Sequence, residues 1–298
     1  MKILVTGGAG FIGSNLIVKL LSLGHTVYSL DNYSTGTKTN EHDGCTYVRD
    51  SVHQIAYLFN DQTFDVIFHL AALARIQPSF ENPLDVFDAN IAGTQLVLEY
   101  ARRTSAKVVF TGSSSRWHDP EQSPYAMSKY IGEQLCRMYK TSFGMNVQIA
   151  RFYNVYGPGE ILDGDYATVI GIWRRKRDSG EPLPIYGDGE QRRDFTHVFD
   201  ICEGLTRIME TDIRDKEWEL GTGVNYSVNQ ICDMFGSVKG TERVYLPDRK
   251  HNYKETIRMD DAALTELGWH PEDRIADYIR GLCPPYAPLP LNIIYKLH

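Results

Sequence analysis

Hydrophobic and polar positions follow two alternating rhythms through the first half of the chain. Short runs rich in β-branched and aliphatic residues predict strands, and longer stretches with apolar residues at every third or fourth position predict amphipathic helices. The predicted strands are Lys2–Thr6, Thr26–Leu30, Thr46–Val48, Asp65–Leu70, Lys107–Thr111 and Asn146–Arg151. The predicted helices are Ile12–Leu23, Leu84–Arg103 and Tyr125–Ser142. This alternation is typical of a doubly wound α/β fold, in which helices cover both faces of a parallel sheet and ligands bind beyond the carboxyl ends of the strands.

The rhythm changes after Gly157, where the predicted elements become shorter and Pro, Gly and charged residues increase. We therefore predict one domain over residues 1–157 and a smaller, discontinuous α/β domain over residues 158–298. The segment Val198–Met209 has the periodicity of a helix that could pack on the first sheet. Residues near 194–212 are therefore predicted to return to the first domain.

Composition and charge narrow the class of protein. The 298 residues include 31 Lys and Arg against 38 Asp and Glu, a net charge of -7 that argues against nucleic acid as a partner. No apolar run approaches the roughly 20 residues of a membrane span, and the Gly-rich start does not resemble a signal peptide. The five cysteines are scattered and form no C-x-x-C pair. A cytoplasmic protein without disulfides, metal site or membrane partner is expected.

A glycine-rich turn follows the first predicted strand and opens the first predicted helix, in the order Val5-Thr6-Gly7-Gly8-Ala9-Gly10-Phe11-Ile12-Gly13. Glycines allow a tight turn and close approach of a pyrophosphate to the backbone, at the positive end of the helix. Asp31 ends the second strand about 20 residues later, where a carboxylate can accept hydrogen bonds from the ribose hydroxyls of a dinucleotide. Because a 2′-phosphate would meet the charge of Asp31, NAD is favoured over NADP. An ordinary turn and a surface carboxylate are the alternatives.

Tyr125 and Lys129 are four residues apart and therefore share one face of a predicted helix. A phenol titrates at about 10 in water, and the ammonium together with the charge of an oxidised nicotinamide would bring its pKa towards neutrality. Tyr125 could then take a proton from a sugar hydroxyl. The preceding strand ends in Ser113, whose hydroxyl could reach the same oxygen, although a serine there could also cap a helix.

These motifs together resemble the extended short-chain dehydrogenase/reductase family, in its NAD-dependent nucleotide-sugar epimerase/dehydratase branch typified by UDP-galactose 4-epimerase. The resemblance extends from Met1 to about Leu282 and includes HLAA at His69–Ala72, YAMSK from Tyr125, RFYNVYGPG at Arg151–Gly159 and LGWHP at Leu267–Pro271. It implies an NAD-binding Rossmann domain followed by a sugar-nucleotide-binding domain.

The resemblance also assigns residues to roles. Ser113, Tyr125 and Lys129 align with the catalytic residues. The predicted NAD contacts are Gly7, Gly10, Phe11, Ile12, Gly13, Asp31, Asn32, Asp50, Ser51, Leu70, Ala71, Ala72, Asn90, Tyr125 and Lys129. Asn154, Arg193 and Arg249 align with groups that hold the nucleotide diphosphate, with Arg192 or Arg258 as further candidates and surface ion pairs as the alternative. His69 and His197 are predicted to be structural.

Two departures from the family pattern concern the sugar end of the site. The loop between Ser115 and Tyr125 is shorter than usual, and Trp117 and His118 replace a Tyr-Gly pair, which shortens the predicted pocket wall. Ser114 and Ser115 stand where the dehydratase members carry Asp-Glu. Since neither serine can serve as a carboxylate acid or base, 4,6-dehydratase and decarboxylase chemistry are disfavoured.

The leading hypothesis is an NAD-dependent 4-epimerase of nucleotide-diphosphate sugars, most simply UDP-sugars, which acts through transient oxidation at C4 with Tyr125 as base. An NAD(P)H-dependent 4-keto-sugar reductase is the nearest alternative, followed by a dehydratase or decarboxylase and by a non-catalytic NAD-binding protein. The resemblance further implies a homodimer that pairs through Leu84–Arg103 and Tyr125–Ser142.

Overall fold

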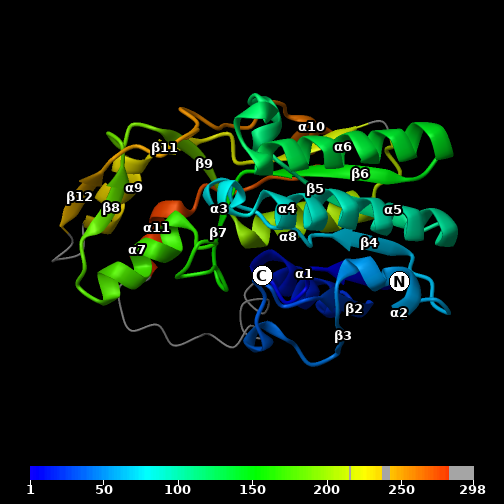
Figure 1. Ribbon diagram of the computed structural model, residues 1–298. Helices are drawn as coiled ribbons and strands as arrows, with labels where there is room; N and C mark the ends of the chain where they lie inside the picture. Colours follow the sequence, from blue (N-terminus) through cyan, green and yellow to red (C-terminus); the bar gives the residue numbers. More distant parts are fainter. Residues whose placement is uncertain (215, 237–241, 282–298) are drawn as a thin grey trace.

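A seven-stranded parallel sheet forms the larger part of the molecule (Figure 1). The computed structural model describes residues 1–214, 216–236 and 242–281. The strands follow the order β10-β6-β5-β4-β1-β2-β3. Their bounds are Lys2–Thr6 (β1), Thr26–Asp31 (β2), Cys45–Arg49 (β3), Val66–His69 (β4), Lys107–Ser113 (β5), Val147–Phe152 (β6) and Glu217–Leu220 (β10). The predicted doubly wound α/β fold is confirmed, and β10 is an additional parallel strand beside β6.

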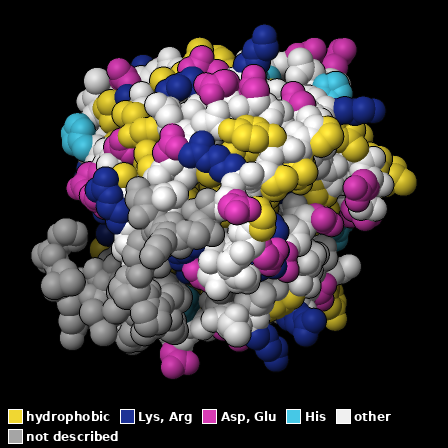
Figure 2. Space-filling model, turned by 90° about the vertical axis from the view of Figure 1, so that its left-hand side faces the viewer, with side chains coloured by type: hydrophobic (Ala, Val, Ile, Leu, Met, Phe, Trp, Pro, Cys, Tyr) yellow, Lys and Arg dark blue, Asp and Glu magenta, His cyan; other side chains and the backbone are white. Residues whose placement is uncertain are grey.

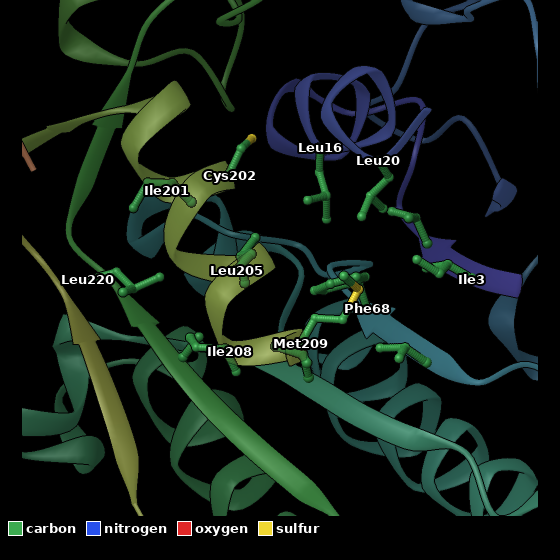
Figure 3. Close-up of a cluster of buried hydrophobic side chains, with 14 of the residues drawn as sticks. Ile3, Leu16, Leu20, Phe68, Ile201, Cys202, Leu205, Ile208, Met209 and Leu220 are labelled. Atoms are coloured by element: carbon green, nitrogen blue, oxygen red, sulfur yellow. The ribbon is translucent and has the colours of Figure 1, made fainter. Parts of the chain in front are cut away.

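Alternating side chains along the strands give this sheet two apolar faces. In β1, Ile3 and Val5 belong to one buried cluster and Leu4 to the other, as the two-residue period of a strand requires. Helices α1 (Phe11–Ser22) and α8 (Val198–Glu210) cover the first face. Figure 3 shows side chains of both helices converging with Ile3 and Phe68 from the strands.

The opposite face is covered by α2 (Ile55–Leu58), α5 (Gly93–Thr104) and α6 (Pro124–Phe143). The predicted helix Leu84–Arg103 is not a regular α-helix, because a π-helical turn at Asp88–Ala92 separates α4 (Pro83–Phe87) from α5. Such turns insert an extra residue into a helix and are frequent at functional sites. Asn90 is the buried residue of this π-helical turn and is 2% exposed. Its side chain hydrogen-bonds groups beside the cavity described below.

Smaller sheets gather at the other end of the molecule, on the left of Figure 1. One contains β7 (Asn154–Tyr156), β9 (Arg192–His197) and β11 (Asn225–Ser227), and the other pairs β8 (Leu183–Tyr186) with β12 (Arg243–Leu246). The helices of this end are α7 (Val169–Asp178), α9 (Val228–Gly236) and α11 (Ile275–Gly281), and they bury a separate core around Trp173 and Phe235. Two short helices, α3 (Ile76–Glu81) and α10 (Ala262–Glu266), flank the large sheet.

The chain crosses between these parts more than once. After β9, α8 packs on the large sheet and β10 extends it, so segments far apart in sequence complete one core. The division into domains at residue 157 remains a prediction, and residues 282–298 of the second predicted domain lie outside the described part of the chain. Cys45, Cys136, Cys202 and Cys232 are free thiols.

Figure 2 shows a face of the molecule on which Lys and Arg side chains are interspersed with Asp and Glu, so neither sign of charge dominates there. Every helix in the described part of the chain is too short or too polar to span a membrane. The smaller sheets and the carboxyl ends of the large sheet meet at the cavity that forms the candidate site.

Candidate active site

One cavity of about 920 Å³ lies between the carboxyl ends of the large sheet and the smaller sheets. This volume is near the upper end of the range of roughly 300–1,000 Å³ for ligand sites, enough for a dinucleotide and a second ligand to lie together. The cavity is lined by all predicted site residues except Asn90. They are Gly7, Gly10, Phe11, Ile12, Gly13, Asp31, Asn32, Asp50, Ser51, Leu70, Ala71, Ala72, Ser113, Tyr125, Lys129, Asn154, Arg193 and Arg249.

The turn after β1 requires glycine, because a side chain at Gly7 or Gly13 would collide with backbone. Without side chains, its backbone is open to a ligand. Gly7 has φ +75°, and a Cβ there would lie 2.8 Å from the nitrogen of Ala71. A Cβ on Gly13 would lie 2.2 Å from the carbonyl oxygen of Gly7. Gly10 caps α1 without any side chain, so the first amides of the helix face the cavity. This cradle fits a pyrophosphate held by backbone N–H groups at a helix N-terminus.

Asp31 ends β2 beside this turn and anchors it. Its carboxylate accepts hydrogen bonds from the amide of Ala9 at 2.9 Å and from the amide of Tyr33 at 2.7 Å. Burial raises the pKa of Asp31, although both amide contacts oppose the rise. Each carboxylate oxygen can accept a further hydrogen bond, and Asp31 lines the cavity, which suits hydrogen bonds from a ribose. The arrangement fits NAD.

Asn90 acts beside the cavity rather than in its lining. Its Oδ1 accepts a hydrogen bond from the amide of Leu73 at 2.8 Å, and its Nδ2 donates to the carbonyl of Leu73 and to Oγ of Ser128. The π-helical turn directs this side chain inward. Asn90 therefore connects the segment after β4 with α6, which carries Tyr125, and its expected contact with NAD remains a prediction.

Tyr125 and Ser113 come together from neighbouring elements. Ser113 ends β5, and Tyr125 is in the first turn of α6, which Ser123 caps by accepting a hydrogen bond from Ala126. The Ser113 hydroxyl hydrogen-bonds the phenol. It also accepts from the amide of Ser115 at 3.2 Å, so Ser113 forms the cap that was the alternative, and its catalytic role stays a prediction.

Lys129 lies one helical turn after Tyr125 and is 6% exposed. Its Nζ donates a hydrogen bond to the carbonyl of Thr111 at 2.9 Å. Burial lowers the pKa of Lys129 to about 8, and the charge of Glu133 opposes this shift. The carbonyl of Thr111, near the carboxyl end of β5, thus holds the ammonium at the cavity.

The expected lowering of the Tyr125 pKa by Lys129 is not found in the chain alone. Burial raises the pKa of Tyr125, and the groups that oppose the rise are Ser113, through its hydrogen bond, and Arg75, through its charge. Arg75 belongs to no motif recognised in the sequence, and it lines the cavity after β4. Desolvation outweighs local charge here, so the positive nicotinamide of bound NAD would be the further group that favours phenolate.

A buried ion-pair network stands behind this site. Arg151 on β6 hydrogen-bonds Glu133 of α6 at 2.8 and 2.9 Å and Glu219 of β10 at 2.8 Å. All three side chains are 3% exposed or less. Since Glu133 also follows Lys129 by one turn, the network fixes the helix that carries both predicted catalytic residues. Sequence reasoning missed it because the partners are distant along the chain.

The short loop before Tyr125 is anchored at both of its unusual residues. Trp117 donates its indole N–H to Glu219 at 3.2 Å. His118 stacks on Tyr253, with ring centroids 3.8 Å apart and planes within 7°. Tyr253 lines the cavity, so the short loop packs through His118 on a residue of the cavity wall that is distant in sequence.

Three predicted diphosphate-binding residues line the smaller-sheet side. Arg193 donates hydrogen bonds to the carbonyl of Arg192 and to Asn252, and burial lowers its pKa to about 10. Arg249 lies 3.6 Å from the centroid of the Tyr186 ring. The side-chain nitrogen of Asn154 donates hydrogen bonds to the backbone carbonyl of Asp194 and to the hydroxyl of Thr256.

Arg192 and Arg258, the further candidates, bind protein groups instead. Arg192 donates to Asn225, and Arg258 donates to the carbonyls of Gly221 and Thr222. Neither residue lines the cavity. They stabilise the loops around β9 and β11.

The two buried histidines have structural surroundings. His69 is hydrogen-bonded through both ring nitrogens, to Thr6 at 2.8 Å and to Thr94 at 3.0 Å. His197 accepts a hydrogen bond from the amide of Phe199 at the start of α8. Within residues 1–214, 216–236 and 242–281, no cluster of His, Cys, Asp and Glu has the arrangement of a metal site.

Comparison with known proteins agrees with this geometry. Residues 3–221 match the NAD dependent epimerase/dehydratase family. A Methanocaldococcus jannaschii protein with the provisional name UDP-glucose 4-epimerase is 32% identical over 296 residues, covering 93% of this chain and 96% of the relative. UDP-glucuronic acid decarboxylase 1 of Xenopus tropicalis is 30% identical, covering 91% and 68%.

A solved structure extends the similarity to the fold. The UDP-glucose 4-epimerase of Thermotoga maritima, solved with UDP-glucose, matches with a TM-score of 0.88 and 30% identity, covering 94% of this chain and 96% of that one. The glycine cradle, the Ser113–Tyr125–Lys129 arrangement and these similarities agree. The chain therefore belongs to the NAD-dependent epimerase/dehydratase family, enzymes of nucleotide sugars that use NAD.

Proposed function

We propose that this protein is a 4-epimerase of nucleotide-diphosphate sugars with tightly bound NAD. The observation that carries the proposal is the convergence of Ser113, Tyr125 and Lys129 on one cavity that has serines, and no carboxylates, at positions 114 and 115. Oxidation and reduction at C4 need one base that accepts and returns a proton. Elimination of water or controlled loss of CO₂ needs a further acid or base at those positions.

In this mechanism Tyr125 transfers the proton, and Ser113 and Lys129 position the reacting groups. Tyr125 takes the proton of the C4 hydroxyl and returns it after the 4-keto sugar has turned, while Ser113 orients the shared hydrogen bond. Lys129 binds the nicotinamide ribose and adds a positive charge near the phenol. Bound NAD supplies a reversible hydride acceptor, so no reductant is consumed over a cycle.

The substrate side of the cavity is suited to a diphosphate. Arg193 and Arg249 present guanidinium groups, which bind phosphate oxygens in pairs, and no described carboxylate forms an ion pair with either. An acidic protein needs such local cations to attract a dianion. UDP-sugars, the ligands named for the relatives, are the proposed substrates.

Purified enzyme should interconvert UDP-glucose and UDP-galactose, or their N-acetyl analogues, without added reductant. Tyr125→Phe should retain bound NAD, measured by mass spectrometry of the denatured protein, and lose activity by about 10²–10⁴-fold, the usual contribution of a general base. Turnover only with stoichiometric NAD(P)H consumption would identify a 4-keto-sugar reductase. Release of CO₂ from a uronate substrate would identify a decarboxylase.

We also propose a homodimer in the cytoplasm. Apolar side chains remain exposed along α4, α5 and α6, namely Leu84 at 82%, Leu96 at 38%, Met138 at 42% and Phe143 at 52%. A helical face of this kind suits an isologous interface between two copies of the chain. The free thiols suit a reducing compartment.

A further inference from the structure

Arg75 is a cation in the cavity that the proposed mechanism does not use. It lies between β4 and α3 and is half-buried. Its Nε donates a hydrogen bond to the carbonyl of Tyr166 at 3.1 Å, and its Nη1 donates to the carbonyl of Ala74 at 3.2 Å. These neutral acceptors orient the guanidinium but leave its charge without a counterion.

No carboxylate of the described residues forms an ion pair with Arg75. The carboxyl that acts on its charge is Glu160, which already accepts hydrogen bonds from Thr168 at 2.6 Å and from Tyr278 at 3.1 Å. Withdrawing a guanidinium from water without a partner is costly, and burial lowers the pKa of Arg75 accordingly. A guanidinium in such surroundings suits an anionic ligand, because buried charges in proteins are normally paired.

The position of Arg75 relates it to the sugar rather than to the diphosphate. Its charge acts on Tyr125, and the phenol acts on Arg75 in return. Arg193 and Arg249 come from the smaller-sheet side and already provide a guanidinium for each phosphate. Because Tyr125 must touch the C4 hydroxyl, a cation beside it faces the substituents of neighbouring carbons.

Ser115 adds a second unused donor. The residue lines the same cavity and is 4% exposed, and its hydroxyl has no hydrogen-bond partner within the described part of the chain. Buried hydroxyls normally have a partner. A hydroxyl and a guanidinium together suit a carboxylate, which can accept several hydrogen bonds.

We propose that the preferred substrate is a nucleotide-diphosphate hexuronate, whose C5 carboxylate is bound by Arg75 with Ser115 as a second donor. The inference rests on the proposed 4-epimerase function and names its substrate class. C5 is bonded to C4, so the carboxylate lies within reach of a group that neighbours Tyr125.

The ion pair also has a chemical consequence. Oxidation at C4 makes the uronate a β-keto acid, which loses CO₂ when the C5–carboxyl bond breaks and its electrons move to the C4 oxygen. A guanidinium stabilises the carboxylate charge in the reactant and so opposes this loss. The expected product is the C4 epimer with its carboxylate retained.

The test compares two substrates and a matched pair of variants. Wild type, Arg75→Gln and Arg103→Gln are assayed with UDP-glucuronate and UDP-glucose, and UDP affinity is measured by calorimetry. Arg103 is a matched control because its side chain is 64% exposed on α5, outside the cavity. Products are identified by mass spectrometry, and kcat/KM is recorded against pH.

Wild type should prefer UDP-glucuronate and release its C4 epimer. Arg75→Gln should lower kcat/KM for the uronate about 100-fold more than for UDP-glucose, as expected for loss of one partner of a buried charge pair. UDP affinity should stay unchanged, and Arg103→Gln should match wild type on both substrates.

Other results would overturn the inference and leave the 4-epimerase function standing. Equal losses on both substrates with a shifted pH profile would make Arg75 a residue that acts on Tyr125. Weaker UDP binding by Arg75→Gln would assign Arg75 to the diphosphate. By contrast, a wild type that epimerises neither sugar would overturn the proposed function itself.

Discussion

Tyr125, Lys129 and His69 are ionisable side chains that the fold withdraws from water. Burial raises the pKa of Tyr125, lowers that of Lys129 to about 8 and lowers that of His69 to about 3. At neutral pH the phenol is therefore protonated in the chain alone, the ammonium keeps its charge, and the imidazole is neutral. In the proposed mechanism, proton transfer from the sugar to Tyr125 consequently depends on further positive charge from bound NAD.

Two buried histidines should lower stability as the pH drops below about 6.5, because they must then take up protons on unfolding, whereas Glu160 and Asp200 act in the opposite sense, since burial raises their pKa values to about 7 and about 6. Burial lowers the pKa of His69 and of His197 to about 3, against about 6.5 for an exposed imidazole. Between these values the unfolded chain binds more protons than the folded chain. Each histidine can therefore cost up to about 1.4 kcal/mol per pH unit.

Urea unfolding at pH 7 and pH 5 measures this effect. His69→Gln should unfold more easily at pH 7 but show a smaller loss between the two pH values than wild type. His270→Gln serves as a control, because its side chain is exposed. An equal loss of stability in wild type and in His69→Gln between the two pH values would contradict the argument.

All predicted site residues except Asn90 line the cavity, because local sequence determines the geometry of the turns that carry them. The glycine turn and the Tyr125–Lys129 pair are examples, since each acts within a few positions along the chain. Arg75 could not be found in this way, because its environment is made by Tyr166 and Glu160 from distant segments. The stacking of His118 on Tyr253 could not be predicted either, because the two residues are distant in sequence.

At the scale of elements, α6 connects the proposed catalytic residues to the core. Its first turn carries Tyr125, its second Lys129 and its third Glu133, which pairs with Arg151 of β6. Glu219 of β10 and Trp117 of the short loop join the same network. Displacement of β6 or β10 would thus be transmitted to the position of Tyr125.

Arg151→Met should destabilise the protein by about 3–5 kcal/mol, because it leaves Glu219 buried without a cation and leaves Glu133 with only the longer contacts of Arg137 and Arg116. Chemical denaturation gives the free energy of unfolding. The control is Arg103→Met, which removes an exposed ion pair with Glu99 and should cost less than about 1 kcal/mol.

A double variant tests the cause. Glu219→Gln in the Arg151→Met background should recover part of the lost stability, because it removes one of the stranded charges. If Arg151→Met were no more destabilising than the control, the network would have no structural importance.

Periodicity predicted the elements of the large sheet better than those of the smaller ones. Six strands and α1, α6 and α8 lie within a few residues of their predicted bounds. Strand β10, Glu217–Leu220, was missed because its charged residues pair with Arg151 and Arg137 and so interrupt an apolar run. The π-helical turn at Asp88–Ala92 was missed because hydrogen bonds of Asn90, and no local pattern, require it.

At the scale of the whole molecule, the exposed apolar side chains of α4, α5 and α6 have the arrangement of an interface. Leu84 is the most exposed of them and lies on α4, which packs against α6. A dimer through these helices would bury the outer face of the elements that position Tyr125 and Asn90. Assembly and catalysis would then be coupled through α6.

Leu84→Glu should convert a dimer into a monomer, because two copies of the introduced carboxylate would meet near the axis of an isologous interface. Light scattering after size-exclusion chromatography measures the mass. Leu23→Glu is the control, since Leu23 is 45% exposed at the end of α1, which covers the other face of the sheet. A wild type that is monomeric at micromolar concentration would contradict the proposed assembly.

The central claim is that hydride leaves C4 and returns to C4 within one closed site. A UDP-sugar carrying deuterium at C4 tests it most directly when the purified enzyme, with its bound NAD and no added reductant, reacts in ordinary water. The account predicts that the epimer formed keeps its deuterium at C4, as read by mass spectrometry and NMR. Formation of the epimer with hydrogen in place of deuterium at C4 would contradict it.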